Sequence, residues 1–391
     1  MFLNKSSDDL GGVTGTTGKS IGMADPPKLH KTIKGQAVLF AVLIGIRVLI
    51  AGVVLFPEKI LFTIVVAICA SIFMRYLCSN IWSTKGMIAT QFMLSLICSD
   101  LVCFLVWLCV DKPQTGVMFL LWMTGAVALV FMSVLMLYGV INERIIVRHS
   151  LEISSAKLER EYRIAVLSDI HYATIQNKSI LEKAVQRIND EQPDAIMILG
   201  DIAEEHTPGE RIPELFDILA RLKSEYGTFF VHGNHDRQEK LHNENRTYTD
   251  EEFNMLMKRA GITCIDDQQK ELNSDLVIIG REDFSFGNRK TVEELFLNVP
   301  DNHFVIVMEH QPIDCEKIAE AGAELCLAGH YHGAQNWTNN IIYRLSDIPY
   351  DGYYRFGELV LYVNAGIAGS KYPIRTHSHN EYLMVHCKRS R

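Results

Sequence analysis

Two histidines stand two positions apart between glycines in the stretch "LAGHYHGAQ" (327–335), directly after an apolar run. Imidazole is a common ligand of divalent transition metals, but two histidines alone do not make a metal site. Similar polar groups follow other apolar runs: "SDIH" (168–171), "GD" (200–201), "GNHD" (233–236) and "EHQP" (309–312). Their chemistry depends on whether the fold brings them together.

The polar groups after these runs supply oxygen and nitrogen donors without sulfur, a set that suits Mn²⁺, Fe or Zn²⁺. Asp169 and His171 alternate at i and i+2, so an extended backbone turns both side chains to the same side. The residues of metal-binding type at these positions are Asp169, His171, Asp201, Asn234, His235, Asp236, His310, His330 and His332. One tetrahedral ion takes four ligands, so the set favours two ions about 3.5–4 Å apart, the arrangement used for in-line phosphoryl displacement.

Short apolar runs and amphipathic segments alternate through the second half of the chain and would position these groups. Strands are predicted at 162–169, 195–201, 228–234, 276–280, 304–310, 324–330, 358–366 and 382–387, and helices at 178–190, 212–223 and 312–322. Two capping boxes, Thr249 with Glu252 and Thr291 with Glu294, predict two more helix starts. The pattern indicates an α/β sheet buried on both faces, with the polar groups at the carboxyl edge where such sheets bind ligands. Taken singly, each group is equally consistent with a turn residue, a helix cap or a core histidine.

Long apolar runs dominate the first part of the chain. After a Gly/Ser/Thr-rich segment (1–35), predicted to be a disordered tail, runs at 36–56, 58–78, 88–110 and 117–140 are each close to the roughly 20 residues that cross a bilayer as a helix. We therefore predict four transmembrane helices over 36–141, followed by a polar linker over 142–160. The alternative is that these runs form buried helices of a soluble domain, but four such runs in succession disfavour it.

Charged residues around the predicted spans suggest their orientation. Lysines precede the first span, Arg75 and Lys85 lie between the second and third, and Arg144 and Arg148 follow the fourth. By the positive-inside rule all these flanks are cytoplasmic, which predicts a multi-pass protein of the inner or plasma membrane with a cytoplasmic catalytic domain. Arg47 and Asp100 lie within spans; they are interpreted as a mutual pair or as a contact for a lipid headgroup or ion.

Charge and cysteine usage exclude some classes of function. Residues 1–150 carry 12 Lys and Arg against 7 Asp and Glu, a net charge of +5, and the remainder carries 26 against 39, a net charge of −13. An acidic domain argues against nucleic-acid binding by phosphate neutralisation. The nine cysteines include no CxxC pair, so neither a disulfide framework nor a thiolate metal site is expected.

The order D-x-H, GD, GNHD, H, GHxH resembles the calcineurin-like metallophosphoesterase superfamily, over residues 161–391. The resemblance implies a four-layer α/β/β/α sandwich with a two-metal centre. It implies that Asp169, His171 and His332 hold the first metal, that Asn234, His310 and His330 hold the second, and that Asp201 bridges them. His235 would be the general acid, oriented by Asp236, and a bridging hydroxide would attack phosphorus.

The substrate is left open by these motifs. The predicted spans resemble the bacterial membrane-associated branch of the family, which includes hydrolases of the UDP-2,3-diacylglucosamine pyrophosphate. We therefore expect hydrolysis of a phosphodiester or pyrophosphate in a lipid-linked or headgroup substrate. A membrane sensor or scaffold with a vestigial catalytic domain is the alternative from another class.

Several further residues have two interpretations at this stage. Glu204 and Glu205 are either partners of the metal ligands or part of a solvated face, and His232 is interpreted as a strand-end histidine or a partner of the ligands. In "SKYPIRTHSH" (370–379), Arg375 either contacts a substrate phosphate or belongs to an ordinary basic loop.

Overall fold

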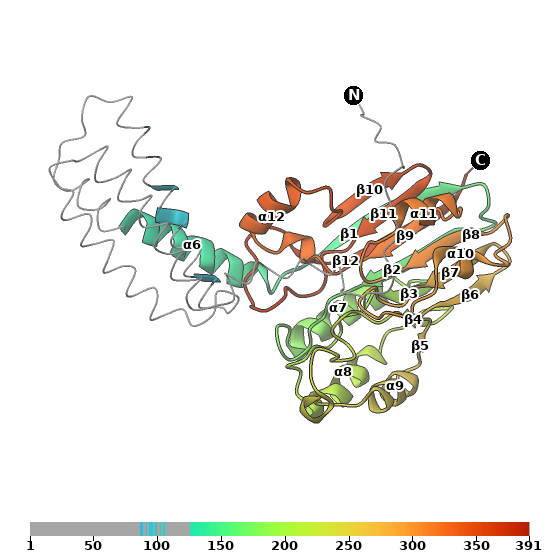
Figure 1. The fold of residues 1–391 in the computed structure, drawn as a ribbon, viewed down its shortest axis with the longest axis horizontal. Helices are drawn as coiled ribbons and strands as arrows, with labels where there is room; N and C mark the ends of the chain where they lie inside the picture. Colours follow the sequence, from blue (N-terminus) through green and yellow to red (C-terminus); the bar gives the residue numbers. More distant parts are fainter. Residues whose placement is uncertain are drawn as a thin grey trace, which may run out of the picture.

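The computed structural model describes residues 126–390, together with residues 87, 88, 91, 94–96, 98, 99, 102 and 105. The predicted tail, the first two predicted spans, Arg47 and Asp100 lie outside the described residues, as do most of the third span and the start of the fourth. The rest of the fourth predicted span belongs to helix α6 (Ala126–Asn142), which extends away from the sheets (Figure 1). In the part of the chain that the structure describes, no helix is both long and apolar enough to cross a membrane.

Two six-stranded mixed sheets form the body of the molecule. The first sheet has the order β1 (Ile146–Ser155), β12 (Asn380–Arg389), β2 (Tyr162–Leu167), β3 (Ala195–Ile198), β4 (Thr228–Phe230) and β5 (Ile262–Cys264). Strands β2 to β5 run parallel, β12 is antiparallel to β2, and β1 is parallel to β12. The carboxyl ends of β2, β3 and β4 therefore meet at one edge.

The second sheet has the order β10 (Gly352–Phe356), β11 (Leu359–Val363), β9 (Leu325–Ala328), β8 (Phe304–Met308), β7 (Leu276–Gly280) and β6 (Gln268–Asn273). Its four central strands are parallel, and each edge strand is antiparallel to its neighbour. Because the central strands are buried on both faces, they are almost wholly apolar.

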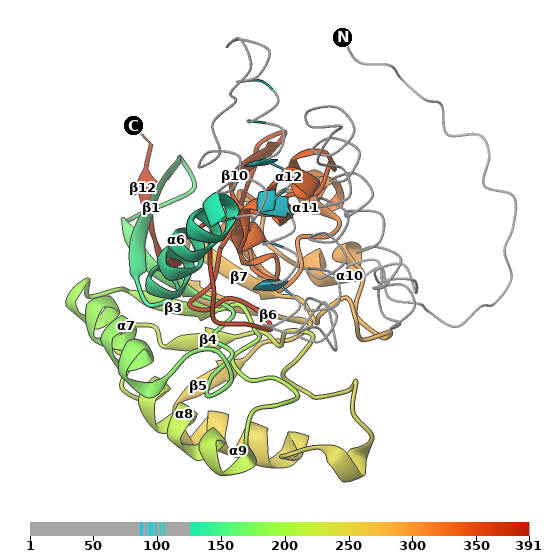
Figure 2. The same ribbon diagram turned by 90° about the vertical axis from the view of Figure 1, so that its left-hand side faces the viewer.

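Helices cover the outer faces of both sheets. Helices α7 (Lys178–Asp190), α8 (Ile212–Leu219) and α9 (Asp250–Arg259) lie along the first sheet, and α10 (Val292–Phe296) and α11 (Cys315–Glu320) lie on the second (Figures 1 and 2). A further helix, α12 (Trp337–Arg344), follows the second histidine motif. Alternate residues of one strand face opposite layers, since Val166 of β2 packs between the sheets and Leu167 packs against the helices. The layers are therefore α/β/β/α, as the resemblance implied.

Local sequence signals explain several helix boundaries. Asn177 caps α7 by accepting a hydrogen bond from the backbone N–H of Ile180, and the apolar positions of the predicted helix are all buried. Both predicted capping boxes are present, at the starts of α9 and α10. These elements begin where the sequence predicts them.

The structure corrects three kinds of prediction. The predicted linker 142–160 contains β1, whose register with β12 pairs Ile146 with Asn380. The strands before the polar groups are shorter than predicted, because the backbone leaves the sheet at Leu167, Ile198, Phe230, Met308 and Ala328. Strands β5, β6 and β10 were not expected; β6 is polar and mostly exposed at the edge of its sheet, which hides it from an apolar pattern.

Candidate metal centre

The carboxyl ends of five strands bring the predicted ligands together. Two groups of side chains each offer one ligand atom within 4.8 Å of the others in that group: Asp169, His171 and His332, and Asp201, His310 and His330. Five of these six residues are buried and His330 is half-buried. The grouping separates the two histidines of the "GHYH" motif, which belong to different clusters.

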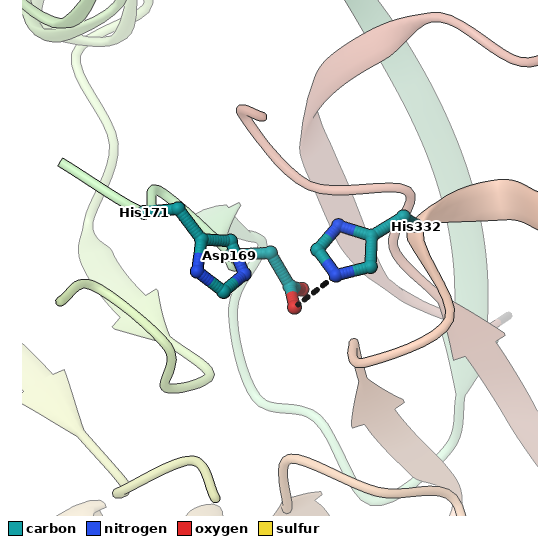
Figure 3. Close-up of side chains that lie close together, drawn as sticks. All are labelled: Asp169, His171 and His332. Carbon is teal, nitrogen blue, oxygen red and sulfur yellow. Dashed lines mark ion pairs between the residues drawn. The ribbon is translucent and has the colours of Figure 1, made fainter. Parts of the chain in front are cut away.

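The first group faces inward from β2 and from the loop after β9 (Figure 3). The Nε2 atom of His332 lies 3.6 Å from Oδ1 of Asp169, and the rings of His171 and His332 are 5.2 Å apart. The Nδ1 atom of His332 lies 2.9 Å from the carbonyl oxygen of Ala368. Donation from Nδ1 to that carbonyl leaves the Nε2 lone pair turned toward Asp169, as a metal ligand requires.

The second group is arranged around His310. Its Nε2 atom lies 3.1 Å from Oδ2 of Asp201, 3.3 Å from Nδ1 of His330 and 3.2 Å from Oδ1 of Asn234. Its other ring nitrogen is 2.7 Å from the carbonyl oxygen of Leu199. Oδ2 of Asp201 is also 3.9 Å from Nε2 of His171, so this carboxylate lies between the two groups.

The backbone of both groups adopts an uncommon conformation. Asp169, His171, Asp201, His330 and His332 all have φ between 43° and 76°, in the left-handed region that non-glycine residues rarely occupy. Gly233 allows one of the closest approaches, because a Cβ atom there would lie 2.2 Å from Oδ1 of Asp201. Strained backbone held by its surroundings is typical of functional sites.

Asp236 has a different role from the one the sequence suggested. Its carboxylate accepts hydrogen bonds from four backbone N–H groups, those of Asp201 and Gly233 on one oxygen and those of Ile202 and Ala203 on the other. The predicted orientation of His235 by Asp236 is therefore wrong. Asp236 fixes the two loops that carry Asp201 and Asn234.

Glu205 contacts His235 instead. Oε2 of Glu205 lies 2.5 Å from Nδ1 of His235, and the His235 side chain is partly exposed at the rim of the centre. The backbone N–H of His235 donates to Oδ1 of Asp201 at 2.9 Å. The sequence signal was the carboxylate four residues after Asp201, although sequence alone did not separate Glu205 from a solvated face.

Glu204 makes a similar contact with His171, at 3.1 Å between Oε2 and Nδ1. Burial alone would lower the pKa of His171, but the carboxylates of Glu204 and Asp201 outweigh it and raise this pKa to about 9. Burial likewise opposes ionisation of Glu204, yet the close contact with His171 lowers the pKa of Glu204 to about 2. Both glutamates are therefore partners of the site histidines.

Several buried ligand atoms have no hydrogen-bond partner among the described residues: Oδ1 of Asp169, Nε2 of His171 and Nε2 of His330. Burial, followed by the nearby charge of His310, lowers the pKa of His330 well below its usual value. Unpaired buried oxygen and nitrogen atoms are costly unless a ligand satisfies them. The residues therefore fit a pair of divalent cations.

Comparison with known proteins agrees with this geometry. Residues 162–334 match the family model described as calcineurin-like phosphoesterase. Residues 162–334 therefore form a calcineurin-like metallophosphoesterase domain. This domain is that of a metal-dependent phosphoesterase, as the resemblance implied.

Three relatives illustrate the range of similarity. An uncharacterised metallophosphoesterase of Campylobacter jejuni is 25% identical over 67% of this chain and 69% of its own length. A transmembrane protein with metallophosphoesterase domain of Danio rerio is 25% identical over 67% of this chain and 62% of its own. Phosphodiesterase YaeI of Escherichia coli is 27% identical over 57% of this chain and 81% of its own. Each alignment leaves part of the relative unmatched.

A third group of possible ligands lies near the metallophosphoesterase centre: His232, Cys264 and Asp266. Here the Asp266 carboxylate already pairs with His232 at 2.5 Å and with Arg237 at 3.0 Å. Burial would lower the pKa of His232, but Asp266 raises it to about 10. A protonated histidine and an arginine against one carboxylate form an ion-pair network, which does not suit a cation.

Proposed function

We propose that the chain is a membrane-anchored dimetal phosphohydrolase that cleaves a phosphodiester or pyrophosphate bond. The observation that carries this proposal is the pair of buried ligand groups separated by one carboxylate, Asp201, with His235 at their rim. A structural zinc site would instead coordinate a single ion with four protein ligands. Two adjacent groups suit the clamping of the attacking and leaving oxygens in an in-line displacement.

In this proposal Asp169, His171 and His332 would hold one divalent ion and Asn234, His310 and His330 would hold the other, with the Asp201 carboxylate lying between the two groups. Two such ions, when bound, lower the pKa of water and offset charge that develops on the phosphoryl oxygens. The oxygen and nitrogen donors, without thiolate, suit Mn, Fe or Zn. The protein supplies fixed ring orientations, since carbonyl oxygens at Leu199 and Ala368 hold His310 and His332.

His235 is the proposed general acid. Oε2 of Glu205 lies 2.5 Å from Nδ1 of His235 and fixes the orientation of the ring, so that Nε2 is the nitrogen left to face a substrate. Lys240 lies 3.5 Å from Nε2, on the exposed side of the ring. A proton at this nitrogen is available to the leaving oxygen of a substrate that enters from the rim.

Membrane attachment is supported by the surface of α6. This 17-residue helix has no acidic residue in its first turn and no basic residue in its last. Its exposed large apolar side chains are those of Val127, Leu129, Val130, Phe131, Val134, Leu137, Tyr138 and Ile141. Such a surface is unfavourable in water, which is consistent with the predicted fourth span and with a lipid-linked substrate. The basic flanks predict a cytoplasmic domain, so a C-terminal reporter active only outside the cytoplasm would contradict this orientation.

The proposed activity is tested with the full-length protein in detergent. With Mn²⁺ it should release nitrophenol from bis(p-nitrophenyl) phosphate, and Asp201→Asn should abolish the release. Asp217→Asn, on an exposed side chain paired with Arg259, is the matched control and should leave the rate unchanged. If the wild-type protein binds metal but hydrolyses neither this diester nor a UDP-linked diacyl sugar, the sensor or scaffold alternative replaces the enzyme.

A further inference from the structure

Arg375 was a candidate for binding a substrate phosphate, but its side chain is completely buried. The guanidinium donates to backbone carbonyl oxygens on two neighbouring loops, those of His332 at 2.8 Å, Ala368 at 2.8 Å and Ala365 at 3.1 Å. Such a group has no N–H directed at solvent or substrate. Its hydrogen bonds instead hold the loops that carry the candidate metal ligands.

Two of these carbonyl groups determine where His332 lies. Arg375 binds the carbonyl oxygen of His332 itself, a residue with φ of 51°. It also binds the carbonyl oxygen of Ala368, which receives Nδ1 of the His332 ring. Arg375 therefore supports both the strained backbone and the ring orientation of this candidate ligand.

The other side of Arg375 faces the end of helix α6. Nε of Arg375 lies 3.4 Å from Oε2 of Glu143, which directly follows the helix and is 3% exposed on its side chain. Oε1 of Glu143 accepts the backbone N–H of Gly369 at 2.8 Å. The last residue of the helix, Asn142, donates to the carbonyl oxygens of Arg375 and Ser378 at 3.0 and 2.8 Å.

Close packing accompanies these hydrogen bonds. The backbone N–H of Arg375 donates to the carbonyl oxygen of Gly139, one turn before the end of α6. A Cβ atom at Gly139 would lie 2.6 Å from Ile374 and 2.8 Å from Thr376. The helix end and the loop 374–376 therefore touch without room for a side chain between them.

We propose that Arg375 and Glu143 are positioning residues that tie the end of α6 to the loop of His332, so that binding of the first metal ion depends on the docking of α6. The inference rests on the proposed two-metal function. Partners that orient a metal ligand typically contribute about 10–100-fold to metal affinity. Displacement of α6 would therefore weaken the ion held by Asp169, His171 and His332 and leave the other ion in place.

The test measures Mn²⁺ bound to the full-length protein by equilibrium dialysis, together with the electron paramagnetic resonance spectrum of the bound ions. The wild-type protein should bind two ions per chain and show the spectrum of a coupled pair. Arg375→Gln, Glu143→Gln and Gly139→Leu should each weaken one ion at least tenfold and convert the spectrum to that of an isolated ion. A merely structural role would not remove one ion selectively.

Two variants are the controls. Tyr162→Phe removes a buried hydrogen bond to Asp275 at the opposite end of β2, and Val130→Leu alters an exposed position of α6; both should still bind two ions. If Arg375→Gln does not fold by circular dichroism, the Glu143→Gln and Gly139→Leu proteins decide. Folded variants that bind two ions with wild-type affinity would overturn the inference, whereas a wild-type protein that does not bind two ions would overturn the proposed function.

Discussion

Replacement of Asp236 by asparagine isolates the contribution of one carboxylate to the stability of the site. Each of its oxygens accepts two backbone N–H groups, at distances of 2.8 to 3.2 Å, and the residue is 1% exposed. An asparagine amide offers one acceptor oxygen, so two N–H groups lose their partner whichever way the amide is turned.

The expected loss follows from this count. A buried donor left without a partner costs about 1–3 kcal/mol, so Asp236→Asn should lower the free energy of unfolding by about 2–6 kcal/mol. That is a large fraction of the roughly 5–15 kcal/mol that stabilises a typical domain. The loss should be present without any metal, because the hydrogen bonds involve only the loops around Asp201 and Gly233.

Urea unfolding of the full-length protein in chelator, followed by circular dichroism, measures this quantity. Asp190→Asn, at an exposed carboxylate that pairs with Gln186, serves as the control and should change the free energy of unfolding by no more than about 0.5 kcal/mol. A loss below about 1 kcal/mol for Asp236→Asn, together with a 100-fold fall in hydrolysis, would refute the reasoning. Asp236 would then act on the reaction through His235, as the sequence first suggested.

Three further outcomes are expected. Glu205→Gln should slow the hydrolysis of diesters with poor, alkyl leaving groups by about 100-fold or more and should affect nitrophenyl esters little, because only a poor leaving group needs the proton of His235. Equal losses of rate for both substrates would contradict this role. Burial raises the pKa of Glu381 to about 7, so the folded state retains a proton that the unfolded state loses near pH 4.5. The free energy of unfolding should therefore fall by about 3 kcal/mol as the pH rises from about 4.5 to about 7. Glu381→Gln should remove this slope, measured by urea unfolding at pH 5 and pH 8, and an unchanged slope would exclude Glu381 as its source. Removal of both metal ions by a chelator should lower the melting temperature by roughly 10–20 °C, since two sites, each filled at 100 times its dissociation constant, contribute about 5.4 kcal/mol together. An unchanged temperature would mean that no stabilising ion binds.

Local signals were sufficient to predict much of the fold. The apolar spacing and the cap at Asn177 define α7, and β7 has the predicted bounds 276–280. The strand ends were placed too late because Asp169 and Asp201 adopt left-handed backbone conformations, which sequence periodicity does not reveal. Strand β1 was interpreted as a linker because its mixed polar sequence has no buried face as regular as that of a central strand.

The candidate ligands were predicted by type and order, and the structure brings them together. Their partners were harder to predict. Glu205 and His235 are 30 positions apart, and no local pattern indicates which carboxylate contacts the ring. Arg375 stands in a polar segment that resembles an exposed basic loop, and only the three-dimensional structure reveals carbonyl groups from distant segments around it.

The parallel pairing of β1 with β12 determines how far the N-terminal part of the chain can be truncated. A protein cut to begin at residue 161 would lose β1, and β12 would become an exposed edge with unpaired backbone groups along Asn380–Arg389. Bare edges of this kind invite association between molecules, so such a fragment should aggregate even if its active residues are intact. Expression boundaries for crystallisation should therefore begin before Asn142, which keeps both the strand and the polar contacts that precede it.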